Sequence, residues 1–146
     1  MAETIVVGTD GSDTAKQAVA EAVRLAKALD AEVHVVTAFE PARRAKVVGA
    51  PEGAAAFWGP LTNDVARSII DEADASIRAA GVKVKPHMVQ KAPADALLDV
   101  AKDVDATLIV VGSQGMAGAR RLLGSVPNKV SHEARTNVLI VATRKS

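Results

Sequence analysis

The sequence predicts a single α/β domain, residues 1–146, built on a doubly wound sheet of five parallel strands. Three observations support this fold class. Short apolar runs alternate five times with stretches of helical periodicity. The runs are apolar at almost every position, as in strands that helices cover on both faces. The chain also has the length of one ordinary domain.

The five predicted strands are short runs rich in aliphatic and β-branched residues. In chain order they span residues 4–9, 32–39, 82–89, 106–111 and 137–142. The third is the most polar, so we expect it near an edge of the sheet. The fourth, ATLIVV, shows no polar alternation, so we expect it to be buried on both faces.

Apolar residues at helical spacing predict helices between the strands. The turn at 10–13, with several capping candidates, precedes the first helix, and Gly81 is expected to end the second, at 62–80. Ser125 is expected to cap a short last helix with Pro127 in its first turn. The apolar positions are Ala18, Ala22, Leu25 and Leu29 in the first helix, Val65, Ile69, Ala73 and Ile77 in the second, and Ala94, Leu97, Leu98 and Ala101 in the third.

Composition narrows the classes of function. With 18 Lys and Arg against 17 Asp and Glu, the net charge is +1, which offers no global field for nucleic acid or a membrane surface. Only three residues are aromatic, too few for a platform that stacks single-stranded bases. Cysteine is absent, which excludes disulfides and thiol chemistry. Without a signal-like start or a long apolar run, we expect a cytoplasmic protein.

Candidate site residues follow from the fold class, because doubly wound sheets bind ligands outside the carboxyl ends of their strands. The segment with the strongest signal is 112–125, GSQGMAGARRLLGS, directly after the most buried strand. A Gly-rich strand exit can present successive backbone N–H groups to an anion, and a helix N-terminus adds more. The local pattern alone fits a phosphate site and a plain turn equally well.

Three segments resemble the universal stress protein family: VVGTDGSDTAKQAV at 6–19, the segment 112–125 followed by Val126, and TNVLIV at 136–141. The second is similar to the family's nucleotide-binding signature of Gly, two residues, Gly, nine residues, then Gly and Ser or Thr. The resemblance runs in order along the whole chain. It implies a Rossmann-like, adenine nucleotide alpha hydrolase-like fold that often binds ATP. It also implies a homodimer through the last strand, which begins at Asn137 and ends at Ala142.

The resemblance places nucleotide-binding residues at each strand exit. After the first strand they are Gly8, Thr9 and Asp10, with Asp10 near adenine and ribose. Lys91 stands where the family often has Gly, so it either crowds the adenine side or adds a cation there. The other positions are Thr37 and Ala38 beside adenine, Val111 and Gly112 beside ribose, Gly115, Gly118 and Gly124 along the phosphates, and Ser125 and Val126 as hydroxyl and amide donors.

The sequence is compatible with more than one adenine nucleotide. Between Gly115 and Gly124 the chain has eight residues where the family signature has nine, which shifts the amides that wrap a triphosphate. RLLGSVPNKV, at 121–130, also resembles members that bind cyclic AMP. ATP is therefore the first expected ligand, with cyclic AMP and AMP as alternatives, in a protein that senses or sequesters the nucleotide.

Two other functions compete with nucleotide binding. A slow Mg²⁺-dependent ATPase would use Asp10 or Asp13, although acidic residues beside a helix start are more often caps. A flavin-type electron-transfer relative is disfavoured by the scarcity of rings. His34, His87 and His132 lack metal-ligand spacing, so we assign no metal site and no catalytic residue.

Overall fold

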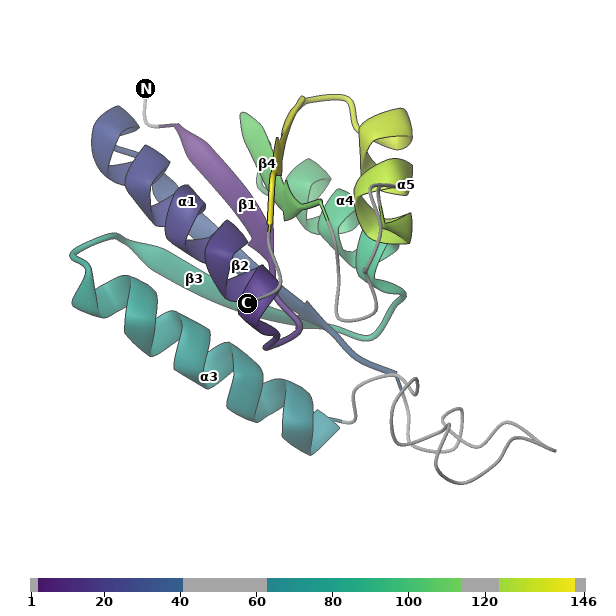
Figure 1. The fold of residues 1–146 in the computed structure, drawn as a ribbon, viewed down its shortest axis with the longest axis horizontal. Helices are drawn as coiled ribbons and strands as arrows, with labels where there is room; N and C mark the ends of the chain where they lie inside the picture. Colours follow the sequence, from purple (N-terminus) through teal and green to yellow (C-terminus); the bar gives the residue numbers. More distant parts are fainter. Residues whose placement is uncertain (1–2, 41–62, 114–123, 144–146) are drawn as a thin grey trace, which may run out of the picture.

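A computed structural model describes residues 3–40, 63–113 and 124–143, and these residues confirm the doubly wound α/β sheet (Figure 1). The five strands are parallel, in the order β3-β2-β1-β4-β5. As expected, the more polar third strand lies at an edge. The strands are β1 (Thr4–Gly8), β2 (Glu32–Ala38), β3 (Val84–Val89), β4 (Leu108–Gly112) and β5 (Asn137–Val141).

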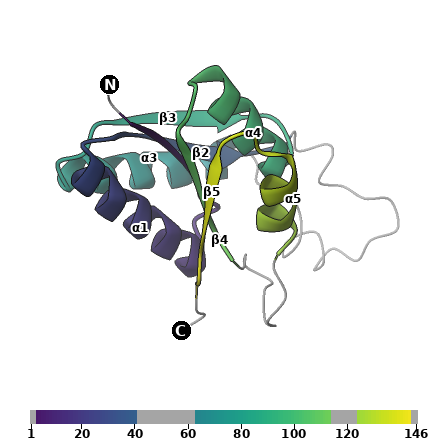
Figure 2. The same cartoon turned by 90° about the horizontal axis from the view of Figure 1, so that it is seen from above.

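The described helices cover both faces of the sheet. They are α1 (Asp13–Leu29), α3 (Asn63–Ala79), α4 (Pro93–Asp103) and α5 (Ser125–Glu133). Helices α1 and α3 lie on one face, and α4 and α5 lie on the other (Figure 2). The chain builds outward from β1 to β3 and then returns to place β4 on the other side of β1. The strand order therefore reverses between β1 and β4, which is the switch point of the sheet.

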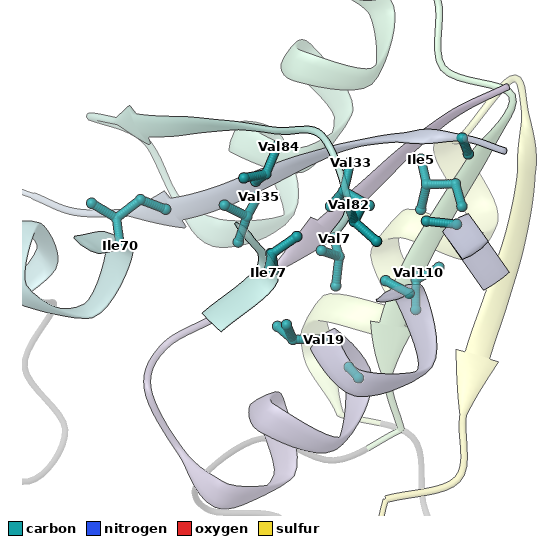
Figure 3. Close-up of a cluster of buried hydrophobic side chains, with 14 residues drawn as sticks. Ile5, Val7, Val19, Val33, Val35, Ile70, Ile77, Val82, Val84 and Val110 are labelled. Carbon is teal, nitrogen blue, oxygen red and sulfur yellow. The ribbon is translucent and has the colours of Figure 1, made fainter. Parts of the chain in front are cut away.

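Each face of the sheet has its own apolar core, because successive strand residues point to opposite sides. On the face of α1 and α3, Ile5 and Val7 pack with Ile70 and Ile77 (Figure 3). On the face of α4 and α5, Val6 packs among residues of those helices. This two-sided burial explains why the strands show no polar alternation.

The predicted helical stripes hold in α4 and, except at Leu29, in α1, but in α3 only Ile77 of the four predicted positions is buried. Leu29, the last residue of α1, is 47% exposed, and Val65, in the first turn of α3, is 48% exposed. In α3 the buried positions are Ala66, Ile70 and Ile77. A spacing of exactly four residues drifts around a helix of 3.6 residues per turn, so the predicted stripe was out of phase at its start.

Helix endings explain why two strands begin later than predicted. At three helix ends a residue with positive φ precedes an apolar residue whose N–H bonds to the carbonyl five residues back. Val82 and Ala106 are such residues, so they close helices and β3 and β4 begin two residues after them. The pairs are Asp30 with Ala31, Gly81 with Val82, and Asp105 with Ala106. Within the described ranges, no helix is long and apolar enough to cross a membrane.

Candidate functional site

The exits of β1 and β4 lie side by side at the switch point, and the next described helices, α1 and α5, lie on opposite faces of the sheet. Val7 pairs with Val110 in the sheet. After Gly8 the chain turns to α1 on one face, and α5, which follows β4 in the element order, lies on the other. Parallel sheets bind ligands at such a place. The predicted residues Gly8, Thr9, Asp10, Val111 and Gly112 lie at these two exits.

Of the remaining predicted residues, Thr37 and Ala38 end β2, and Gly124, Ser125 and Val126 form the start of α5. Gly115 and Gly118 lie outside the described residues.

The exits of β1 and β2 are fastened to each other by Thr9 and Thr37. The N–H of Thr9 donates to the carbonyl of Val36 at 2.9 Å, and the Thr37 hydroxyl donates to the carbonyl of Thr9 at 3.1 Å. Thr37 is fully buried. Its hydroxyl proton is therefore committed to the fold, and a ligand at this exit would meet backbone rather than the Thr37 side chain.

The turn into α1 assigns different roles to the acidic residues and the serine. Ser12 is the N-cap, because its hydroxyl accepts the N–H of Ala15 at 3.1 Å. Asp10 accepts the N–H of Ser12 at 2.9 Å through Oδ1, and Asp13 is the first helical residue. The expectation that Asp10 or Asp13 caps the helix is thus wrong. The second carboxylate oxygen of Asp10 has no hydrogen-bond partner among the described residues.

Two glycines of this region are favoured by close packing or by backbone conformation. A Cβ on Gly8 would lie 3.1 Å from Cδ2 of Leu97, so glycine lets α4 approach the end of β1. Gly11 has a φ of +84°, a conformation that side chains disfavour. Gly8 therefore has a structural reason to be glycine, independent of any ligand.

The start of α5 differs from the sequence prediction in its cap. Gly124, not Ser125, is the N-cap, since Ser125 already has helical backbone and begins α5. Gly124 has φ −64° and ψ 168°, which any residue can adopt. Its N–H donates to the carbonyl of Ser113 at 3.0 Å, so this amide is already engaged.

Three donors remain at the start of α5. The amides of Ser125 and Val126 and the exposed Ser125 hydroxyl make no hydrogen bond to another described residue. Pro127, the third residue of α5, has no N–H. Free amides and the positive end of the helix dipole attract anions. This end of α5 can therefore offer two amides and one hydroxyl to a single anionic group.

Lys91 does not present a free cation to the strand exits. Its ammonium group pairs with the Asp99 carboxylate on α4, and that hydrogen bond raises the pKa of Lys91 above its ordinary value. Both side chains are about half exposed. The charge that Lys91 adds at this position is thus largely balanced by the neighbouring helix.

Two histidines that lie far apart in the sequence, His34 and His87, are in contact in the structure. Nδ1 of His34 lies 2.8 Å from Nε2 of His87, and Nε2 of His34 lies 2.8 Å from a carboxylate oxygen of Glu32. Neighbouring strands bring them together, because His87 pairs with Val36 in the register of β2 and β3. The register between β2 and β3 cannot be read from the sequence alone, so the contact between the two histidines was not predicted. Within the described part of the chain, no group of three or more His, Cys, Asp or Glu side chains could hold a metal ion.

Burial and nearby charges disfavour protonation of His87. Desolvation is the main cause that lowers its pKa below the ordinary value of histidine, and the charges of His34 and Lys85 act in the same direction. Asp103, on α4, opposes them. The net effect favours the neutral imidazole of His87.

The chain is similar to known proteins over nearly its whole length. The model of the universal stress protein family matches residues 1–142. Universal stress protein Rv1636 of Mycobacterium tuberculosis H37Rv is 38% identical over 147 residues, which cover 97% of each chain.

Solved structures agree with this match. A crystal structure of a universal stress protein in complex with cAMP has a TM-score of 0.72 and 38% identity, covering 97% of this chain and 98% of that chain. The universal stress protein from Archaeoglobus fulgidus in complex with dAMP has a TM-score of 0.71 and 25% identity, with coverage of 96% and 98%. A match in sequence and in fold over nearly its full length shows that this chain belongs to the universal stress protein family.

Proposed function

We propose that the protein binds an adenine nucleotide at the exits of β1 and β4 and acts as a sensor or store of that nucleotide. One observation carries the proposal. A relative with 38% identity and the same fold over almost the whole chain has been crystallised in complex with cAMP. The dAMP complex of the Archaeoglobus fulgidus protein supports the same class of ligand.

The start of α5 is the phosphate end of this proposed site. The amides of Ser125 and Val126 and the Ser125 hydroxyl supply three donors, and the helix dipole adds a favourable field. Since Pro127 offers no further amide, these donors suit one phosphate group, as in AMP or cyclic AMP. The further phosphates of ATP would need donors from the segment that holds Gly115 and Gly118.

The exit of β1 is the nucleoside end. Asp10 uses one carboxylate oxygen for its own turn and keeps the second for a ribose hydroxyl. With ATP as ligand, a Mg²⁺ ion would take most of its oxygens from the phosphates and from water, because the described residues gather no ligand set of their own.

Titration calorimetry with AMP, cyclic AMP and ATP, with GTP as control, tests the proposal. The wild-type chain should bind at least one adenine nucleotide and discriminate against GTP. Ser125→Ala should weaken AMP binding about ten- to a hundredfold, because a hydrogen bond to a charged group contributes about 1.5–3 kcal/mol.

The matched control is Ser131→Ala, which removes another exposed hydroxyl of α5, one that donates to the carbonyl of Asn128. Its affinity should equal that of the wild type. A wild-type chain that binds none of the three adenine nucleotides contradicts the proposal. An unchanged affinity in Ser125→Ala contradicts the phosphate position alone.

We also propose that two copies pair antiparallel through β5. The two edges of the sheet differ. At β3, bonds from Val33 N–H to the carbonyl of Lys83 and from Phe39 N–H to that of Val89 place odd-numbered backbone groups toward β2. The backbone groups of the even-numbered residues of β3 therefore point away from the sheet. One of these residues is Pro86, which has no N–H to donate at this edge.

The β5 edge carries no such block. Ser113 donates its N–H to the carbonyl of Val141, so the backbone groups of Val138 and Ile140 point outward. The strand, NVLIV, contains neither proline nor a charged residue. An unblocked apolar edge pairs readily with another strand, and a two-fold axis joins two identical edges antiparallel.

A further inference from the structure

Ser113, the first residue after β4, joins three segments of the chain through hydrogen bonds. Its N–H donates to the carbonyl of Val141 in β5 at 2.8 Å. Its hydroxyl oxygen accepts the N–H of Thr143 at 3.1 Å. Its carbonyl accepts the N–H of Gly124, the N-cap of α5, at 3.0 Å.

The Ser113 hydroxyl takes over a bond that its own carbonyl would make in a regular sheet. In a parallel ladder, a residue that donates to Val141 accepts the N–H of Thr143 through its backbone carbonyl. Here the hydroxyl accepts that N–H, and the carbonyl is free to accept from Gly124. Thr143 is 5% exposed, so its N–H cannot turn to water without cost.

We propose that Ser113 is a positioning residue that sets the start of α5, and with it the donors of Ser125 and Val126, against the end of β5. This inference rests on the proposed function for its role in binding. Without the hydroxyl, the N–H groups of Thr143 and Gly124 share one carbonyl. The two N–H groups then compete for that carbonyl, so the bond that holds the N-cap of α5 weakens, although the substituted side chain touches no phosphate.

Amide hydrogen exchange, followed by NMR without ligand, tests the positioning itself. In Ser113→Ala the acceptor of the Gly124 N–H remains, yet we expect that amide to exchange about tenfold faster. Ser113→Thr keeps a hydroxyl and should restore the wild-type rate. The control Ser131→Ala should leave Gly124 unchanged.

A Gly124 rate that stays at the wild-type value in Ser113→Ala, with only Thr143 accelerated, overturns the proposal. If Ser113→Ala does not fold, Ser113→Cys makes the same comparison, because a thiol fills the place of the hydroxyl and accepts hydrogen bonds weakly.

Binding supplies the second readout. We expect Ser113→Ala to lower the affinity for AMP and for cyclic AMP about tenfold. Ser113→Thr should bind both nucleotides with the wild-type affinity. Equal affinity in Ser113→Ala and wild type overturns the role of Ser113 in binding. A wild-type chain that binds no nucleotide contradicts the proposed function instead, and exchange at Gly124 then decides alone whether Ser113 positions α5.

Discussion

Several polar side chains near the strand exits hold the backbone rather than stand free for a ligand. The Thr37 hydroxyl binds the carbonyl of Thr9, Asp10 binds the amide of Ser12, and Ser113 accepts from Thr143. Each bond fixes a backbone segment beside the switch point. The backbone around the proposed site is therefore ordered before binding, which lowers the entropic cost of binding a ligand.

At the scale of single residues, His87 predicts a pH dependence of stability. Its pKa is lowered in the folded protein, mainly by burial, whereas the unfolded chain titrates near the ordinary value of about 6.5. As the pH falls below about 6.5, the unfolded state gains a proton that the folded state does not. The free energy of unfolding should decrease through this window and level off below the folded pKa.

Urea unfolding between pH 5 and 8 checks this with His87→Gln, whose amide can also hydrogen-bond with His34 but does not titrate. The decrease below pH 6.5 should be smaller in His87→Gln than in the wild type. His132→Gln, at an exposed position, is the control and should follow the wild type. Equal slopes in His87→Gln and wild type would contradict the role of His87.

At the scale of secondary-structure elements, the left-handed residue at the end of α3 predicts how substitutions there change stability. Gly81 ends α3 with a φ of +83°, and a Cβ there would meet no atom within 4 Å. Gly81→Ala therefore introduces no steric clash and changes only the cost of the left-handed backbone conformation. It should lower the free energy of unfolding by about 1–2 kcal/mol. Gly81→Asn should cost less, because asparagine tolerates this conformation better. Equal losses in the two variants, by urea unfolding, would contradict the explanation.

The same helix endings show what a sequence can predict here. Apolar runs and helical periods predicted the five strands, the parallel sheet and its polar edge, since burial on two faces leaves a direct signature in the residue types. Gly81 was recognisable as a helix end, but Asp30 and Asp105 take the same conformation without a glycine signal. The His34–His87 pair and the bonds of Ser113 depend on strand register and on loop closure, which local patterns do not encode.

At the scale of the whole molecule, the two edges of the sheet predict how copies assemble. The Ile140 N–H points away from β4, so Ile140→Pro should leave the internal ladder intact and remove a donor from the pairing edge. We expect the wild type to sediment at twice the chain mass at micromolar concentration and Ile140→Pro to sediment as a monomer.

The matched control is Met88→Pro, which places the same change at an outward position of β3. That variant should remain dimeric. A dimer in both variants would show that the contact lies elsewhere, and a monomeric wild type would contradict pairing through β5.

Pro86 also determines how far such an assembly can grow. Two-fold pairing uses the β5 edge of both copies, and the edges that remain are the two β3 strands, each with a missing donor at its centre. A third chain finds no complete row of backbone donors on which to extend the sheet. If two copies pair through β5, the assembly should therefore stop at the dimer, and a higher concentration should add dimers rather than extend the sheet.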